Sequence, residues 1–184
     1  MQNRIRITFG DRELECQACD DRADFDQCFR QHRVDSLILG EDVEGQRAYD
    51  IVTVHSPIPA RTRVRIGVVS SVQGVSPKIL MRPALQELWI GFNSRVAVVD
   101  TAVPLIRQSF ELDSTFYQFV PMARFGMTLA IHETGIVAIS DGCEIVWTVA
   151  TDVIASVELT VNGIQVGVSD AATILLDPAT GKQI

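Results

Sequence analysis

The feature that most constrains this sequence is a long series of short apolar segments separated by turn residues. From Arg63 onward, segments such as RVRIGVVSSV, ELWIGF, RVAVVD, MTLAIHE and GIVAISD follow one another, and none keeps a helical period. Short, evenly spaced strands are typical of an all-β sandwich, barrel or propeller-like array. The sequence therefore predicts a mainly β fold, an antiparallel meander of short strands that is propeller-blade-like or a sandwich.

The N-terminal third mixes element types. RIRITF and RELECQA alternate apolar and charged residues around Gly10-Asp11, which predicts a β-hairpin. DFDQCFRQH places apolar residues at helical spacing, which predicts one short N-terminal helix over 24–32. No linker rich in Pro, Gly or Ser divides the chain. We expect a single domain over 1–184, in which 1–60 form a β-hairpin, a helix and strands, and 61–184 form antiparallel β repeats.

Three segments in the second half of the chain align with one another. They begin at Ile90, Ala130 and Val166, and each contains a strand, a polar turn, and an apolar strand that ends at an aspartate. The aspartates, Asp100, Asp141 and Asp177, are 41 and then 36 residues apart, close to the ~40 residues of a four-stranded propeller blade. Aspartate at such a position accepts hydrogen bonds from the following backbone N–H groups, so we expect turn formers here.

Two of these segments, AISDGCEIVW and LLDPATGKQI, resemble the repeat of quinoprotein-like (PQQ-type) β-propellers, in which A-x-D, a turn, Thr-Gly and a later Trp recur. The resemblance covers roughly the last half of the chain. Thr180-Gly181 and Trp147 each occur in one copy only. A closed propeller needs at least about four blades, and these residues supply fewer. The resemblance therefore implies a local β-meander geometry and no cofactor.

The stretch CQACDDRADFDQCFRQH gathers four potential metal ligands, with the spacing C-x2-C-x8-C-x3-H: Cys16, Cys19, Cys28 and His32. Such donors can hold structural zinc. However, the strand alternation and the helical period place Cys16 and Cys28 on apolar faces, where free cysteine packs as a small hydrophobe. A redox C-x-x-C normally opens a helix rather than ending a strand. We therefore predict no metal, with this cluster as the alternative, and no disulfide.

Motifs for catalysis are missing from the sequence. It contains no G-x-S-x-G elbow, no H-E-x-x-H, no glycine-rich phosphate loop and no Walker pattern. His55 ends a strand before a proline, and His132 lies in the strand-turn HETG. We expect no enzyme; the alternative is a small β-fold ligand-binding or hydrolytic enzyme that uses His55 or His132.

The charge of the chain constrains its partners. A net charge of −7 and a pI near 4.9 argue against nucleic acid, whose binding needs clustered Lys and Arg. One local exception is RTRVR, which puts Arg61, Arg63 and Arg65 on one strand face. The N-terminus does not read as a signal peptide, and no apolar run is long enough to cross a bilayer. We expect a cytoplasmic protein without a membrane partner.

These observations favour binding to another protein. Acidic residues gather before and within the predicted helix and in the loop that follows it, and loops on a β scaffold often carry recognition: Asp20, Asp21, Asp24, Asp26, Glu41, Asp42 and Glu44. The first hypothesis is a non-catalytic protein-binding protein, such as a bacterial immunity or antitoxin-like protein that caps a basic partner. Another is a scaffold module, or homodimer, that assembles through open sheet edges.

Overall fold

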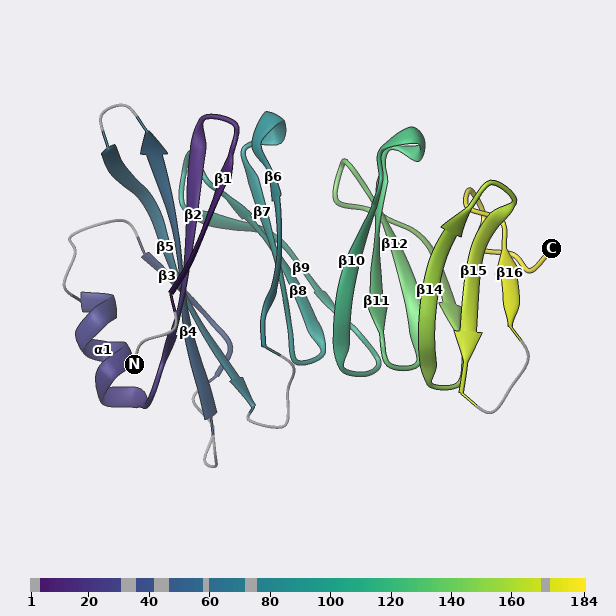
Figure 1. Ribbon diagram of the computed structural model, residues 1–184, viewed down its shortest axis with the longest axis horizontal. Coiled ribbons are helices and arrows are strands. Elements are labelled where there is room, and N and C mark those ends of the chain that lie inside the picture. Colours follow the sequence, from purple (N-terminus) through teal and green to yellow (C-terminus); the bar gives the residue numbers. More distant parts are fainter. Residues whose placement is uncertain (1–3, 31–35, 42–46, 58–59, 72–75, 170–172) are drawn as a thin grey trace. The chain divides into compact units, whose positions relative to one another are not determined.

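The computed structural model describes residues 4–30, 36–41, 47–57, 60–71, 76–169 and 173–184 (Figure 1). They form two compact units, the first comprising Met1–Asn93 and Ala97–Phe110 and the second Ser94–Val96 and Glu111–Ile184. Strands make up 65% of the described residues, so the predicted mainly β fold is confirmed. In each unit, two sheets share one apolar core.

A five-stranded sheet begins the first unit, in the order β1-β2-β4-β5-β3. Its strands are β1 (Arg4–Phe9), β2 (Arg12–Cys19), β3 (Ser36–Leu39), β4 (Arg47–Pro57) and β5 (Ala60–Ser71). The hairpin of β1 and β2 turns at Gly10-Asp11, as the sequence predicts. Every neighbouring pair is antiparallel except β3 and β5, which are parallel. β5, which lies within the predicted segment 61–184 apart from its first residue, pairs with β4 inside this sheet.

The helix α1 (Arg22–Arg30) covers one face of this sheet (Figure 1). It begins before the predicted helix, because Asp21 Oδ1 accepts a hydrogen bond from the Asp24 N–H at 2.8 Å and caps the first turn. The side chain of Phe25 is fully buried against Gly67. A Cβ atom at position 67 would lie 2.5 Å from Phe25 Cζ, so the helix approaches the sheet closely only because this residue is glycine.

A four-stranded antiparallel sheet covers the opposite face of the first sheet, in sequential order. It contains β6 (Lys78–Arg82), β7 (Glu87–Phe92), β8 (Arg95–Asp100) and β9 (Leu105–Glu111), with the 3-10 turn η1 (Pro83–Leu85) between β6 and β7. The core between the two sheets includes Leu14, Val52, Val54, Ile66, Leu88, Ile90 and Val99. Burial of β7 and β8 is not limited to the face in this core: every residue of β7 and the four central residues of β8 are buried, so both faces of these strands are covered.

The second unit repeats this arrangement with two further sheets. One is sequential and four-stranded: β10 (Phe116–Met122), β11 (Met127–His132), β12 (Gly135–Ser140) and β13 (Ile145–Ala150). The other has three strands: β14 (Ile154–Thr160), β15 (Gly163–Val168) and β16 (Ile174–Leu176). A bridge from Leu176 to Gln183 continues this sheet. The shared core contains Leu129, Ile136, Trp147, Ile164, Val166 and Leu176.

The two four-stranded sheets follow a common repeat of 40 residues. β7 and β11 begin at Glu87 and Met127, and each follows a 3-10 turn, η1 or η2 (Ala123–Phe125), that ends in a left-handed residue: Gln86 and Gly126. The backbone N–H of Thr101 donates to the Gln86 carbonyl, and that of Asp141 donates to the Gly126 carbonyl, both at 2.8 Å. Asp141 therefore corresponds to Thr101.

The predicted alignment of Asp100 with Asp141 is thus wrong by one position. Their spacing of 41 differs from the strand repeat of 40, and a shift of one residue moves a strand side chain to the other face. The alignment of Asp141 with Asp177 is wrong by one position as well: Met127 at the start of β11 pairs with Ser140, and the register of β15 with β16 places Gly163 at the start of β15 opposite Asp177, so Asp177 corresponds to Ser140 and to Asp100. Asp100 and Asp177 do form turns: Asp100 accepts from two following N–H groups at 2.7 and 3.0 Å, and Asp177 from two at 2.9 Å.

No helix in the described part of the chain has the length and apolarity that crossing a membrane requires.

Candidate functional site

The structure does not bring the predicted Cys/His cluster together at one point. β2 contains both Cys16 and Cys19, and residues three apart on a strand lie on opposite faces. Cys16 packs toward the core between the sheets, whereas Cys19 and Cys28 pack on the helix side. Burial, together with nearby carboxylates, raises the pKa of Cys16 to about 11 and that of Cys19 to about 12. Both stay protonated at neutral pH, which disfavours metal ligation and redox chemistry. His32 lies outside the described residues.

The predicted acidic cluster around α1 has structural partners. Asp21 caps the helix, and Asp24 Oδ2 accepts a hydrogen bond from the Asp20 N–H at 3.3 Å. Asp26 forms ion pairs of 3.1 and 3.6 Å with the arginines one turn before and one turn after it, Arg22 and Arg30. The side chain of Asp20 is exposed. Most of these carboxylates therefore stabilise the helix, whether or not they also meet a partner.

The other predicted binding residues give a mixed result. Glu41 is exposed, whereas Asp42 and Glu44, and the side chains of Arg61 and Arg63, lie outside the described residues. Arg65 is buried: its Nη1 donates to the Cys28 carbonyl at 2.7 Å, and its Nε donates to Thr53 Oγ1 at 3.4 Å. This arginine ties β5 to α1, and its guanidinium is not presented to solvent.

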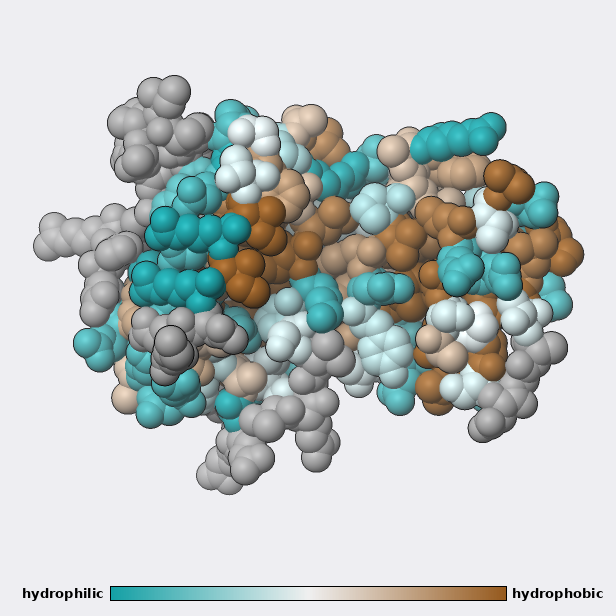
Figure 2. Space-filling model, viewed as in Figure 1, coloured by the Kyte–Doolittle hydropathy of each residue, from teal (hydrophilic) through white to brown (hydrophobic). Residues whose placement is uncertain are grey.

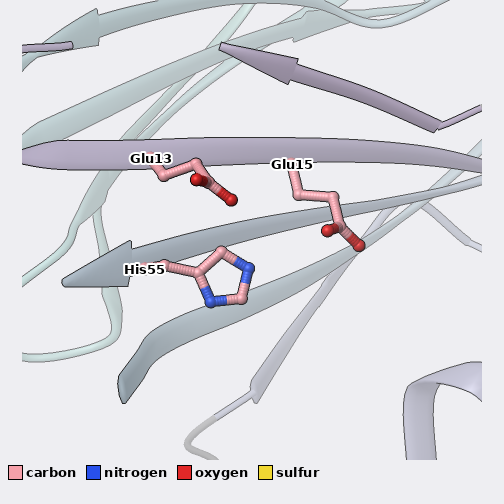
Figure 3. Close-up of side chains that lie close together, drawn as sticks. All are labelled: Glu13, Glu15 and His55. Atoms are coloured by element: carbon pink, nitrogen blue, oxygen red, sulfur yellow. The ribbon is translucent and has the colours of Figure 1, made fainter. Parts of the chain in front are cut away.

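A cluster of Glu13, Glu15 and His55 lies on the helix side of the first sheet (Figure 3). Glu13 and Glu15 are two apart on β2 and share one face, and His55 on β4 pairs directly with Glu13. One ligand atom from each of the three side chains lies within 4.8 Å of the other two. Figure 3 shows the two carboxylates and the imidazole directed into one space.

Two arginines of β1 neutralise this cluster. Arg6 Nε and Nη2 each lie 2.7 Å from Glu15 Oε2, and Arg6 Nη1 lies 3.6 Å from Glu13. Arg4 lies 3.9 Å from Glu15. The Glu15 side chain is only 8% exposed, whereas that of Arg6 is 61% exposed. The buried carboxylate is therefore fixed, and its main counter-charge is a side chain that can turn into solvent.

A second cluster, formed by Ser114, His132 and Thr134, lies in the second unit. Ser114 Oγ is 2.8 Å from His132 Nδ1, and it accepts hydrogen bonds from the Thr134 N–H at 3.0 Å and from Thr134 Oγ1 at 2.9 Å. His132 is 3% exposed, and burial lowers its pKa, although Asp113 acts in the opposite direction. The neutral imidazole can accept the Ser114 proton at Nδ1.

The contact between Ser114 and His132 has a structural role and lacks the features of a catalytic pair. A catalytic serine needs an exposed nucleophilic oxygen and a base that can exchange a proton with substrate. Here the serine oxygen already accepts two hydrogen bonds, and the histidine is buried against Gly135, where a Cβ atom would lie 2.8 Å from His132 Nε2. The pair holds the β9–β10 connection against the turn between β11 and β12.

The loops around this pair form what we call the acidic loop end, residues 111–115, 133–134 and 151–153. Backbone hydrogen bonds join them to one another and to β14: Glu133 N–H to Thr115, Thr151 N–H to Thr134, and Ile154 N–H to Glu133, at 2.8 to 2.9 Å. In Figure 1 these connections lie together at the lower end of the second unit. These three loops contain no Lys or Arg and carry four acidic residues: Glu111, Asp113, Glu133 and Asp152.

Net charge is divided unequally between the two units. The second unit contains nine acidic and three basic residues, a net charge of −6, and the first contains fourteen and thirteen, a net charge of −1. The acidity of the chain thus resides in the second unit, away from the acidic residues predicted as the binding site. The signal was present in the sequence, because only Arg124 and Lys182 are basic after residue 110.

Weaker sequence signals mark the two side-chain clusters. Glu13 and Glu15 stand out only as charges on the polar face of a hairpin, and their proximity to His55 depends on the pairing of β2 with β4. Ser114 lies in a turn with no motif around it, and its contact with His132 depends on the cross-loop hydrogen bonds.

Comparisons with known proteins bear on the fold. No protein-family model matches the sequence, and no curated protein sequence matches it. Among 122 matching chains of solved structures is Sqt1 of Saccharomyces cerevisiae, a WD40 β-propeller, with a TM-score of 0.52 and 9% sequence identity. The match covers 78% of this chain and 46% of the Sqt1 chain, so the chain spans less than half of that protein's length. At this identity the likeness shows the fold alone: blade-like antiparallel sheets of the β-propeller kind.

Proposed function

We propose that this protein acts by binding another protein, without catalysing a reaction, and that the partner is basic. The observation that carries the proposal is the acidic loop end: four acidic residues on connections that backbone hydrogen bonds tie together. Loops fixed on a β scaffold are common recognition surfaces, and a surface of one charge sign accelerates association with an oppositely charged partner. The likeness to a β-propeller is compatible with this role.

The proposal extends to the class of protein. A small acidic chain that covers a basic surface fits an immunity or antitoxin-like protein, whose partner is a basic toxin. Cytoplasmic residence belongs to the same proposal. The resemblance of the last half of the chain to quinoprotein-like repeats supports the blade geometry in this proposal and brings no cofactor.

The experiment first identifies the partner and then measures the binding affinity of the purified partner. The immobilised protein is used to retain partners from a lysate of its source cells, and the retained protein is produced recombinantly and titrated calorimetrically at low and moderate salt. We expect a basic partner whose affinity falls as salt rises. A purified partner that is acidic, or whose affinity does not depend on salt, would contradict the proposal.

Paired variants locate the binding surface. Asp113→Asn with Asp152→Asn removes two charges from the acidic loop end and is expected to weaken binding about tenfold at low salt. Glu144→Gln with Glu158→Gln removes two exposed charges elsewhere in the same unit and serves as the matched control. Asp20→Asn with Glu41→Gln tests the acidic residues predicted from the sequence. Equal losses in all three pairs would show that no specific surface is used.

Assembly through a sheet edge is a second candidate, and β1 favours it. β1 is an edge strand of the first sheet, and Ile5 and Ile7 are 58% and 43% exposed. Figure 2 shows hydrophobic and hydrophilic side chains next to one another where β1 lies. An exposed edge of this kind can pair with a strand of another chain. Light scattering after size exclusion tests it: a dimer that Ile5→Lys converts to a monomer supports edge pairing, and a strict monomer excludes self-assembly.

The Ser114–His132 contact is the observation among the described residues that favours a hydrolytic enzyme. A fluorophosphonate probe, which labels activated serines, distinguishes the two roles. We expect no labelling of Ser114, because its oxygen accepts two hydrogen bonds and its histidine is buried. Labelling that His132→Gln abolishes while the protein stays folded would favour the enzyme over the binding protein.

A further inference from the structure

We propose that Glu13, Glu15 and His55 bind a zinc ion, with one coordination position open to solvent. This inference concerns the first unit and is independent of the proposed function. Its basis is the close approach of the three side chains, whose potential ligand atoms lie within 4.8 Å of one another. Ligands of a tetrahedral zinc ion are about 3.4 Å apart when each lies about 2.1 Å from the metal. Small rotations of the three side chains would shorten the separations between their ligand atoms from at most 4.8 Å to this value.

The backbone already holds the three residues in position. Glu13 and Glu15 are alternate residues of β2, and Glu13 pairs in register with His55 of the neighbouring strand β4. The pairing of β4 with β5 shifts register between Val54 and His55, which marks a β-bulge. Bulges redirect side chains and are common near functional sites. The ligands therefore sit on adjacent strands of a five-stranded sheet, which is a rigid support for a metal site.

The ligand types favour zinc over the common alternatives. An imidazole nitrogen with two carboxylates suits zinc, whereas calcium and magnesium prefer oxygen ligands only. Three protein ligands leave the fourth position of a tetrahedral ion for water or an external group, and the partly exposed Glu13 and His55 leave the cluster accessible from solvent.

Arg6 acts as the counter-cation of this cluster when no metal is bound. Its guanidinium contacts both glutamates, at 2.7 Å from Glu15 and 3.6 Å from Glu13. A zinc ion would replace this charge, and the exposed Arg6 side chain can swing away into solvent. Zinc and Arg6 therefore compete for the same carboxylates, and the zinc affinity of an Arg6 variant tests this competition.

The test is calorimetric titration of the full chain with zinc chloride at neutral pH. We expect one ion per chain, and we expect His55→Gln and Glu13→Gln each to weaken binding by about tenfold or more. Arg6→Gln is expected to strengthen binding several-fold, because it removes the competing cation. A merely structural ion pair would not produce this increase. Circular dichroism shows whether each variant folds, and Arg6→Met, which also removes the cation, replaces Arg6→Gln if the glutamine variant does not.

Two controls separate this site from other zinc ligands. The variant Cys16→Ser, Cys19→Ser, Cys28→Ser removes the thiols of the sequence-predicted cluster and is expected to bind zinc as the natural chain does. Glu158→Gln, an exposed strand glutamate of the second unit, is the matched carboxylate control. Cobalt substituted for zinc should lack the charge-transfer absorption that thiolate ligands give.

Three results would overturn the proposal: no zinc binding by the natural chain, equal binding by His55→Gln, or loss of binding in the cysteine variant alone.

Discussion

The guanidinium of Arg12 and the hydroxyl of Thr101 form a buried hydrogen bond of 2.5 Å between residues 89 positions apart. Thr101 Oγ1 in turn donates to the Gln86 carbonyl at 3.0 Å. The Arg12 Nε has no hydrogen-bond partner among the described residues, although Asp11 lies 3.8 Å from it. The hairpin β1–β2 is thereby joined to the turn after β8 through one threonine hydroxyl.

Thr101→Val is therefore expected to destabilise the first unit. The change keeps the side-chain volume but removes the acceptor of a buried cation, for which we expect a loss of about 2 to 3 kcal/mol in the free energy of unfolding. Thr101→Ser keeps the hydroxyl and should lose less than half as much. Urea unfolding of the three proteins measures the difference. If the valine and serine variants were equally stable, the hydroxyl would not be important.

Gly67→Ala tests the contact between α1 and the first sheet. The added Cβ would lie 2.5 Å from Phe25 Cζ, so the helix must shift, and overpacking of this kind costs about 1 to 3 kcal/mol. Gly142→Ala is the matched control, because its Cβ would meet nothing closer than 3.6 Å. Thermal unfolding should show a clear decrease in Tm for the first variant and little change for the second. Similar melting of both would contradict the close packing of α1.

Asp50 predicts a pH dependence of stability. Burial raises the pKa of Asp50 from 3.8 to about 6. Between these values the folded protein binds more protons than the unfolded chain, so the contribution of this group to stability falls as pH rises from about 4 to about 6 and then stays constant. Asp50→Asn removes that dependence. The variant should be more stable than the natural chain at pH 7 by about 1 kcal/mol, a figure reduced for partial exposure to solvent.

Unfolding of both proteins in urea at pH 4 and pH 7 provides the measurement. The advantage of Asp50→Asn should be present at pH 7 and lost at pH 4, where the natural aspartate is protonated in the folded protein. An advantage of equal size at both pH values would have another cause.

Ser114→Ala tests the cluster in the second unit. The change removes the acceptor of two hydrogen bonds from Thr134 and the partner of His132 Nδ1, and we expect a loss of about 2 kcal/mol. Ser169→Ala, an exposed serine of the same unit, is the control. Guanidinium unfolding compares the two variants, and equal stability would remove the structural role proposed for Ser114.

His132 itself should titrate below its usual pKa of 6.5, because burial disfavours the charged imidazolium. Its folded form therefore binds fewer protons than the unfolded chain, and its contribution to stability is present above pH 6.5 and lost as the pH falls below that value. Nuclear magnetic resonance of the imidazole nitrogens follows this titration directly. A His132 pKa above 6.5 would show that Asp113 outweighs burial.

Sequence patterns predicted the local elements well and their partners poorly. The alternation in RIRITF and RELECQA identified the hairpin, and the spacing of Phe25, Cys28 and Phe29 identified the helix, because both patterns reflect which face is buried. The parallel pairing of β3 with β5 had no local signal, since it depends on where the chain returns after α1.

The same limit applies to the repeats and to the candidate sites. Aspartates made the repeats visible, but Asp141 occupies a position next to the one that Asp100 and Asp177 share, and only the strand pairing shows this. The clusters at His55 and His132 each join residues from different strands or loops. Periodicity within one segment carries no information about such contacts.

The cross-loop hydrogen bonds of the second unit have a kinetic consequence. Glu133 donates its backbone N–H to Thr115 and accepts that of Ile154 at its carbonyl, so three connections are held together before any partner arrives. When a partner docks on the acidic loop end, little entropy is lost in ordering these loops. The rate of diffusional encounter, which long-range charge controls, then determines the rate of association. Added salt should then lower the association rate constant far more than it raises the dissociation rate constant.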